Sequence, residues 1–260
     1  MTSELFSVTG KTVLVTGGTR GVGYMIAEGY LRAGARVYIS SRKADACREA
    51  EKTLSALGEV HAIACDVSTE EQCRALIDTI AERENALHVL VNNAGATWGA
   101  AFDEFPDSAW DKILTVNLKA PFTLTKLARP LLEKASTADD PARVINIGSI
   151  DGLVVPGFNN YSYSAAKAGV HHLTRHMAAD LAPAILVNAI APGPFPSKMT
   201  EKLLAEGGDA LRELTPVHRV GRPDDIAAAA IYLSSPATTF MTGAVIPLDG
   251  GLATTMGIGL

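Results

Sequence analysis

The chain has 260 residues, of which 47% are hydrophobic and 20% are charged, and this balance excludes a disordered chain. With 23 basic and 28 acidic residues the formal net charge is −5, which argues against a broad nucleic-acid-binding surface. No apolar run approaches the roughly 18 residues of a membrane span, and residues 1–11 lack the basic-then-apolar pattern of a signal peptide.

Strand-like and helix-like segments alternate along the chain. Short apolar runs predict strands at Thr12–Thr16, Arg36–Ser40, His61–Cys65, Leu87–Val91, Arg143–Ile147, Ile185–Ile190 and Val245–Leu248. Helical patterns cover Gly21–Ala33, Ala44–Leu57, Thr69–Glu84, Ser108–Lys134, Tyr161–Leu181 and Pro223–Leu233. The alternation predicts an α/β protein with a Rossmann fold: a doubly wound parallel sheet of about seven strands, helices on both faces, in a single domain over residues 1–260.

The cysteines Cys47, Cys65 and Cys73 are odd in number and lack Cys-x-x-Cys or Cys/His spacing. This pattern argues against a disulfide framework and a zinc site, and we expect no metal ligands. Such cysteines are typical of a reducing, cytoplasmic setting.

The turn after the first strand is rich in glycine and reads Thr16-Gly17-Gly18-Thr19-Arg20-Gly21-Val22-Gly23. Glycines let backbone amides approach a pyrophosphate, and the N-terminus of the following helix favours an anion. The spacing is Gly-x-x-x-Gly-x-Gly rather than Gly-x-Gly-x-x-Gly. It predicts a nucleotide cofactor, and a tight strand–helix turn without a ligand is the alternative.

The second strand ends in Ser40-Ser41-Arg42, without the acidic residue that accepts hydrogen bonds from the ribose of NAD. Arg42 and Arg20 can instead pair with a 2′-phosphate, because guanidinium–phosphate pairs are charge-assisted. These residues favour NADP(H) over NAD(H). The alternative is that both arginines are solvated surface residues.

Polar and small residues follow the third and fourth strands. Asp66, before Val67, is placed to accept from an adenine amino group; alternatively, Asp66 or Ser68 caps the next helix. In Asn92-Asn93-Ala94-Gly95 the first amide can tie strands together, and the last two residues leave room for a flat ring. A plain turn is the alternative there.

Tyr163 and Lys167 lie four residues apart on one helical face. A phenol with a pKa of about 10 is a poor acid–base catalyst at neutral pH. An ammonium about 4 Å away, at an effective dielectric constant of about 20, favours the phenolate by roughly 4 kcal/mol, or about 3 pKa units before desolvation. We therefore predict that Lys167 lowers the pKa of Tyr163 and makes it a general acid–base residue.

Ser149 and Asn117 complete the predicted catalytic set. Ser149 ends the fifth strand, where ligands collect in parallel sheets, and can hold a carbonyl oxygen beside Tyr163 or cap a turn. Asn117 can anchor a water that relays protons to Lys167 or be a satisfied core amide. The run around Ser149 lacks the nucleophile elbow Gly-x-Ser-x-Gly, which argues against a serine hydrolase.

Residues 198–220 predict a substrate lid, with Gly207-Gly208 as a candidate hinge and His218 or Arg219 as candidate contacts to a polar substrate end. Apolar residues at helix-like spacing fit a hydrophobic substrate or simple packing. They are Met199, Leu203, Leu204, Leu211 and Leu214. Surface or interface positions are expected for His171, His172 and His176.

Together these motifs resemble the short-chain dehydrogenase/reductase family over residues 10–251. The resemblance rests on Thr16-Gly17-x-x-x-Gly21-x-Gly23, Asn92-Asn93-Ala94-Gly95, Asn117, Ser149, Tyr163-x-x-x-Lys167 and Pro192-Gly193. The runs at residues 94–101, 142–149 and 190–200 resemble the 3-oxoacyl-(acyl-carrier-protein) reductases of the type associated with rhamnolipid biosynthesis.

The resemblance implies NADPH-dependent reduction of a ketone, here a 3-oxoacyl thioester carried by acyl carrier protein. It implies that Tyr163 is the acid–base residue, Lys167 binds the nicotinamide ribose, Ser149 orients the carbonyl and Asn117 holds the relay water. It also implies a homotetramer built on the helices Ser108–Lys134 and Tyr161–Leu181 and on the last strand. The expected cofactor contacts are Gly17, Thr19, Arg20, Gly21, Val22, Ser41, Arg42, Asp66, Val67, Asn93, Ala94, Gly95, Tyr163, Lys167, Pro192, Gly193, Phe195 and Ser197.

Two other functions share the pattern. A dehydrogenase of a polyol, sugar acid or steroid alcohol uses the same chemistry in the oxidative direction. A non-catalytic nucleotide-binding regulatory protein can share the fold. The complete set Asn117, Ser149, Tyr163 and Lys167 disfavours the latter.

Overall fold

The computed structural model describes residues 2–198 and 200–255. Within them, seven strands form one parallel sheet in the order β3-β2-β1-β4-β5-β6-β7. The strands are β1 (Thr12–Thr16), β2 (Arg36–Ser41), β3 (Val60–Ala64), β4 (Val89–Asn92), β5 (Ala142–Ile147), β6 (Ile185–Pro192) and β7 (Val245–Leu248). The order reverses between β1 and β4, and ligands of doubly wound sheets collect beyond the carboxyl ends of the strands at such a switch point.

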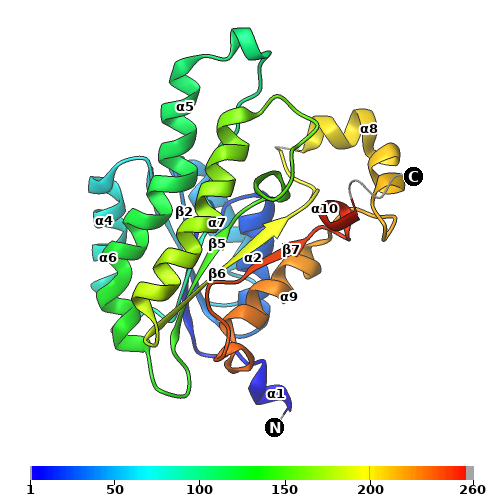
Figure 1. Ribbon diagram of the computed structural model, residues 1–260. Coiled ribbons are helices and arrows are strands. Elements are labelled where there is room, and N and C mark those ends of the chain that lie inside the picture. The colour runs from blue at the N-terminus through cyan, green and yellow to red at the C-terminus, as the bar shows by residue number, and fades with distance from the viewer. Residues whose placement is uncertain (1, 199, 256–260) are drawn as a thin grey trace.

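Helices cover both faces of the sheet (Figure 1). One layer is formed by α2 (Gly21–Arg32), α3 (Ala44–Leu54) and α9 (Pro223–Ser234), and the other by α4 (Glu70–Ala81), α6 (Ala120–Ala135) and α7 (Tyr161–Leu181). The shorter elements are α1 (Thr2–Leu5), η1 (Phe102–Glu104), α5 (Asp107–Leu114), η2 (Thr115–Lys119), η3 (Ile150–Gly152), α8 (Glu201–Leu214), η4 (Pro236–Thr238) and α10 (Leu252–Thr255). This arrangement confirms the predicted doubly wound Rossmann fold.

Strand side chains alternate between two hydrophobic cores. Val13 and Val15 of β1 pack into the core under α2 and α9, whereas Leu14 packs into the core under α4 and α6. All five residues of β1 are buried. Because both faces are covered, the strands are continuous apolar runs without a polar side.

Several predicted bounds shift for identifiable reasons. The helix predicted over Ser108–Lys134 widens in its middle into the π-helical η2, so that α5, η2 and α6 follow one another. The fourth strand starts at Val89 rather than Leu87, because the Leu87 N–H donates to Leu131 of α6 and not to a neighbouring strand. The predictions for Thr12–Thr16 and Tyr161–Leu181 match the structure.

Three general features bear on function. Among the described residues, no helix is long and apolar enough to cross a membrane. Over the same residues, no three His, Cys, Asp or Glu side chains gather into a potential metal site. All three cysteines are buried free thiols.

Candidate active site

The glycine-rich turn packs directly on the end of β4. Gly17 and Gly21 have φ values of +65° and +56°, a region that side chains rarely adopt. A Cβ atom on Gly23 would lie 2.3 Å from Asn93 Nδ2. Asn93 Nδ2 donates to the carbonyls of Thr16 at 2.8 Å and Gly17 at 3.2 Å. Asn93, predicted as a cofactor contact, therefore holds the turn in shape.

The turn and the start of α2 fit a pyrophosphate. No side chain caps α2, so the first backbone N–H groups of this helix are left for a ligand. The helix dipole adds partial positive charge at this point. Ser197 of the loop after β6 closes the other side, with its Cβ 3.2 Å from the Cβ position of Gly21.

Two arginines flank the turn on the side of β2. Arg20 and Arg42 are both exposed, and neither forms an ion pair with any residue that the structure describes. Arg42 follows β2 and Arg20 directly precedes α2, and free guanidinium groups at these positions fit the 2′-phosphate of an NADP cofactor. The alternative, solvated surface arginines, predicts the same exposure, so only cofactor binding distinguishes the two.

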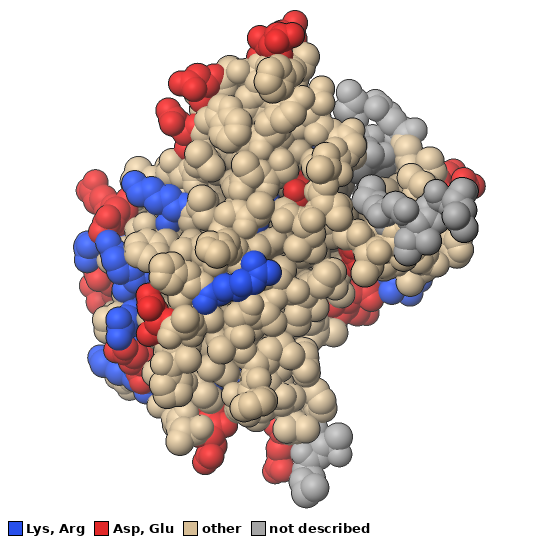
Figure 2. Space-filling view, viewed as in Figure 1, with Lys and Arg blue, Asp and Glu red and all other residues tan. Residues whose placement is uncertain are grey.

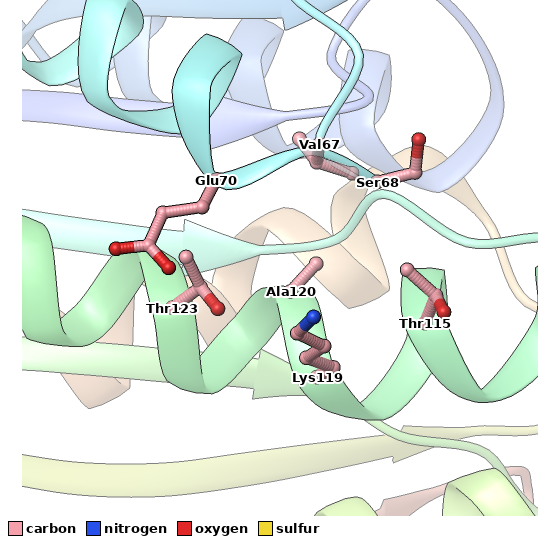
Figure 3. A pocket seen from close by; sticks show the side chains of 7 residues that line it. All are labelled: Val67, Ser68, Glu70, Thr115, Lys119, Ala120 and Thr123. Atoms are coloured by element: carbon pink, nitrogen blue, oxygen red, sulfur yellow. The ribbon is translucent and has the colours of Figure 1, made fainter.

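The end of β3 corrects one sequence expectation. Thr69 caps α4, since its side chain accepts from the Gln72 N–H at 3.4 Å. Asp66 instead accepts from the Ser68 N–H at 3.0 Å, so neither Asp66 nor Ser68 is the cap. Figure 3 shows a small hollow here, between this loop and the segment from η2 to α6. Its lining residues are Val67, Ser68, Glu70, Thr115, Lys119, Ala120 and Thr123.

The predicted catalytic side chains meet at the carboxyl end of β5. The Ser149 hydroxyl lies close enough to the Tyr163 phenol to lower the pKa of the phenol. Ser149 Oγ also accepts from the Asp151 N–H at 3.2 Å, which confirms that it caps a turn, and its contact with a carbonyl oxygen stays a prediction. Lys167 Nζ lies 5.5 Å from the centre of the Tyr163 ring and donates to the Ile147 carbonyl at 2.7 Å.

The pKa of Tyr163 moves in the direction opposite to the prediction. Burial and, less strongly, the Asp151 carboxylate raise the pKa of Tyr163 to about 12, against the opposing effect of the Ser149 hydroxyl. The Lys167 amine does not offset this, because burial lowers its own pKa to about 8 and it is bonded to a backbone carbonyl. The protein alone therefore keeps the Tyr163 phenol protonated at neutral pH.

Asn117 is a satisfied core amide. Its Nδ2 donates to the carbonyls of Ala96 at 2.8 Å and Ile113 at 2.9 Å, which uses both N–H groups. Its Oδ1 lies 2.9 Å from the Cβ position of Gly95, and the Lys167 amine is 4.0 Å from that same position. Asn117 thus ties η2 to the loop after β4 beside Lys167. The relay water stays a prediction.

The loop after β6 reaches the cofactor side through its backbone. Phe195 is 3% exposed and belongs to the core under α2 and α9, where its ring leaves no room for a side chain at Gly221. Its ring therefore serves core packing, and a cofactor contact by Phe195 stays a prediction. A Cβ on Gly193 would lie 2.7 Å from Asp249, which follows β7, so Pro192 and Gly193 pack close to that strand.

Helix α8 occupies the predicted lid. It is kinked at Gly207, where φ is −139° and ψ is 18°, as expected of a hinge there. Arg219 forms a bidentate pair with Asp225 at 2.5 and 3.0 Å, so its guanidinium is not free for a substrate. Met199 and the side chains of Leu203 and Leu204 lie outside the described residues.

Two residues at the site were not predicted. Asp151 accepts from Asn160 Nδ2 at 2.8 Å, and burial raises the pKa of its carboxyl against the Asn160 hydrogen bond and the charge of Lys167. His171, expected at the surface or an interface, is 2% exposed, whereas His172 and His176 are exposed. The available signals were the place of Asp151 just after a strand end and the four-residue spacing from Lys167 to His171.

Burial of the Lys167 amine predicts a pH-dependent stability. Its pKa is about 8 in the folded chain and about 10.5 unfolded, so between these values the unfolded chain binds more protons and the free energy of unfolding rises with pH. In denaturant titrations from pH 7 to 11, we expect the free energy of unfolding of Lys167→Met to rise by about 3 kcal/mol less than that of wild type. Lys126→Met, at a half-exposed lysine, is the control. Equal pH profiles for Lys167→Met and wild type would contradict a buried, neutralised amine.

Comparison with known proteins agrees with the fold and identifies the family. A family model described as enoyl-(acyl carrier protein) reductase matches residues 8–253. The chain belongs to the short-chain dehydrogenase/reductase family, as its motifs indicated.

Among its relatives is the rhamnolipids biosynthesis 3-oxoacyl-[acyl-carrier-protein] reductase of Pseudomonas aeruginosa, 45% identical over 95% of this chain and 97% of that protein. An NADP active-site complex of RhlG from Pseudomonas aeruginosa has a TM-score of 0.93 and 44% identity, covering 96% of this chain and 99% of that one. A gluconate 5-dehydrogenase from Burkholderia cenocepacia, in complex with NADP and tartrate, has a TM-score of 0.89 and 31% identity, covering 98% and 99%.

Proposed function

We propose that this protein is an NADP-dependent oxidoreductase that reduces a ketone to a secondary alcohol, with a 3-oxoacyl thioester on acyl carrier protein as its substrate. The observation that carries the proposal is the meeting of Ser149, Tyr163 and Lys167 at the carboxyl end of β5. The name of the relative from Pseudomonas aeruginosa, at 45% identity, supports the substrate class. The NADP complexes among similar structures support the cofactor.

The cofactor site is built from the chain's own backbone and two arginines. The turn with Gly17 and Gly21 and the uncapped start of α2 bind the pyrophosphate. Arg20 and Arg42 bind the 2′-phosphate. When bound, NADPH supplies the hydride.

The state of Tyr163 supports reduction rather than oxidation. A ketone that gains a hydride develops negative charge on its oxygen and needs a proton there. Tyr163, whose pKa is raised to about 12, holds that proton at neutral pH. Ser149 donates a hydrogen bond to the same oxygen and orients it. Oxidation of an alcohol would need the phenolate, which the protein alone disfavours.

The surroundings of the site favour an apolar substrate over a sugar acid. Exposed apolar side chains stand on the loops that follow β4 and β5, and they are Trp98, Phe102, Leu153, Val155 and Phe158. Phe102 packs edge-on to Tyr161, at the start of the catalytic helix, with ring centres 5.6 Å apart. Arg219, a candidate for binding a substrate carboxylate, is engaged by Asp225.

A substrate panel tests the proposal. NADPH oxidation is followed with 3-oxoacyl thioesters of increasing length, with 5-ketogluconate and with crotonyl thioester. We expect kcat/KM to rise up to about fourfold per added methylene, because each buried CH₂ contributes about 0.8 kcal/mol. Turnover of 5-ketogluconate alone would make the protein a sugar-acid dehydrogenase, and turnover of crotonyl thioester alone an enoyl reductase. NADPH binding without turnover of any carbonyl would favour a regulatory protein.

The remaining proposals concern organisation. We propose a single domain over residues 1–260, in which residues 198–220 form the lid. We also propose a homotetramer: Figure 2 shows that charged side chains gather over α4 and α6, whereas few lie over α7. A charge-poor helical face suits burial between subunits. The free thiols of Cys47, Cys65 and Cys73 support a reducing, cytoplasmic setting.

A further inference from the structure

Helix α7 aligns a third functional side chain with Tyr163 and Lys167. His171 follows Lys167 by four residues, as Lys167 follows Tyr163, so all three lie on one face of the helix. His171 is buried beneath the segment of residues 148–152, which carries Ser149. The proposed reaction gives this imidazole no direct task.

The imidazole contacts the backbone on both sides of Ser149. Nε2 of His171 accepts from the Ser149 N–H at 3.4 Å. A Cβ on Gly148 would lie 2.0 Å from that nitrogen, and one on Gly152 would lie 2.9 Å from Cε1. Only a glycine on each side of Ser149 lets the segment approach the ring this closely.

The neutral His171 imidazole is suited to accept a hydrogen bond at one ring nitrogen. Burial and, less strongly, the charges of Lys167 and Arg175 lower the pKa of His171 to about 4, against the opposing effect of the Gly152 backbone, so the ring is neutral at pH 7. A neutral ring that accepts at Nε2 carries its proton on Nδ1. Nδ1 is buried without a hydrogen-bond partner in the described part of the chain. An apolar side chain would avoid that unpaired group but would leave the Ser149 N–H without an acceptor, so the hydrogen bond to Ser149 is what the histidine contributes.

We propose that His171 is a positioning residue that fixes the Ser149 backbone. It thereby keeps the Ser149 hydroxyl beside Tyr163 and within reach of the substrate oxygen. Ser149 is then held at two points, its N–H by His171 and its Oγ by the Asp151 N–H. Without His171, the Ser149 N–H has no acceptor among the described residues. The inference deepens the proposed ketone reduction and rests on it.

A double-mutant cycle tests the proposal. We expect His171→Leu to lower kcat about 10- to 100-fold, since a loosened oxyanion donor costs this much or more. NADPH affinity is expected to hold and Tm to change little, because the leucine removes the unpaired Nδ1 but leaves the Ser149 N–H without its acceptor, and the two effects offset each other. His171→Gln, whose amide oxygen can reach the Nε2 position, restores most of kcat, and His172→Leu on the exposed side of α7 changes nothing. In a Ser149→Ala background, adding His171→Leu should lower kcat by less than about a further threefold.

Equal fold losses in both backgrounds, or a loss of NADPH affinity and Tm in step with kcat, would overturn the proposal. If His171→Leu fails to fold, Gly148→Ala takes its place in the double-mutant cycle, because the added methyl group displaces the His171 ring. The same changes in kcat are then expected. If the wild type reduces no ketone, the proposed function fails, and the positioning is judged by hydrogen exchange of the Ser149 amide. The proposal is supported if the Ser149 amide exchanges fastest in His171→Leu, more slowly in His171→Gln and slowest in His172→Leu. Equal exchange in all three variants contradicts it.

Discussion

Replacing Tyr163 with phenylalanine is expected to lower kcat for ketone reduction by about 10²- to 10⁴-fold, the usual contribution of a positioned general acid. The phenol meets the Ser149 hydroxyl and keeps its proton at neutral pH, since its pKa is raised to about 12. Removing the hydroxyl removes the proton donor and leaves the aromatic ring in place. NADPH affinity should stay within about threefold, because the pyrophosphate and 2′-phosphate sites lie on other segments.

Tyr161→Phe is the matched control. Tyr161 starts the same helix, but its hydroxyl bonds only weakly to Asn159, at 3.4 Å, and it has no lysine four residues on. Steady-state kinetics with a 3-oxoacyl thioester and fluorescence titration with NADPH measure both variants. Undiminished turnover by Tyr163→Phe would remove this residue from the reaction and with it the proposed mechanism.

Replacing Arg42 with alanine is expected to weaken NADPH binding about 10- to 100-fold and to leave NADH binding unchanged. A hydrogen bond to a charged group contributes about 1.5–3 kcal/mol, and a bidentate guanidinium–phosphate pair lies in the upper part of that range. NADH lacks the 2′-phosphate and therefore has nothing to lose. Since the guanidinium is exposed, the difference should shrink with added salt.

Arg48→Ala controls for a general loss of positive charge near β2. Arg48 lies on α3 and pairs with Asp45, so it is not free for a phosphate. Titrations of both variants with NADPH and NADH measure the ratio of dissociation constants. A ratio in Arg42→Ala equal to that of wild type would place the 2′-phosphate elsewhere, with Arg20 next to be tested.

Local spacing explains why the fold and the meeting of the candidate catalytic side chains could be predicted. The period of the apolar runs fixes strands and helices, and the spacing of Tyr163 and Lys167 places them on one helical face whatever lies around them. The positive φ values of Gly17 and Gly21 follow from the same local logic, since glycine alone adopts them at little cost.

Contacts between distant segments explain what was missed. His171 reaches Ser149 across 22 positions of sequence, and Arg219 is engaged by Asp225, which sits in the first turn of α9. Asn92 bonds to Asn146 of β5 at 2.9 Å, which confirms the prediction that it ties strands together, whereas only the packed structure shows that the adjacent Asn93 supports the glycine-rich turn.

The amino-acid sequence by itself determined the sheet, the class of cofactor and the placing of Tyr163 and Lys167 on one helical face, because each depends on residue type and short-range spacing. Only the tertiary structure decided the protonation of those side chains. A pKa depends on how much water is lost and which partners surround the group, and burial here outweighs the pairing of Tyr163 with Lys167. The same burial turned His171 from an expected surface residue into a neutral acceptor beneath Ser149.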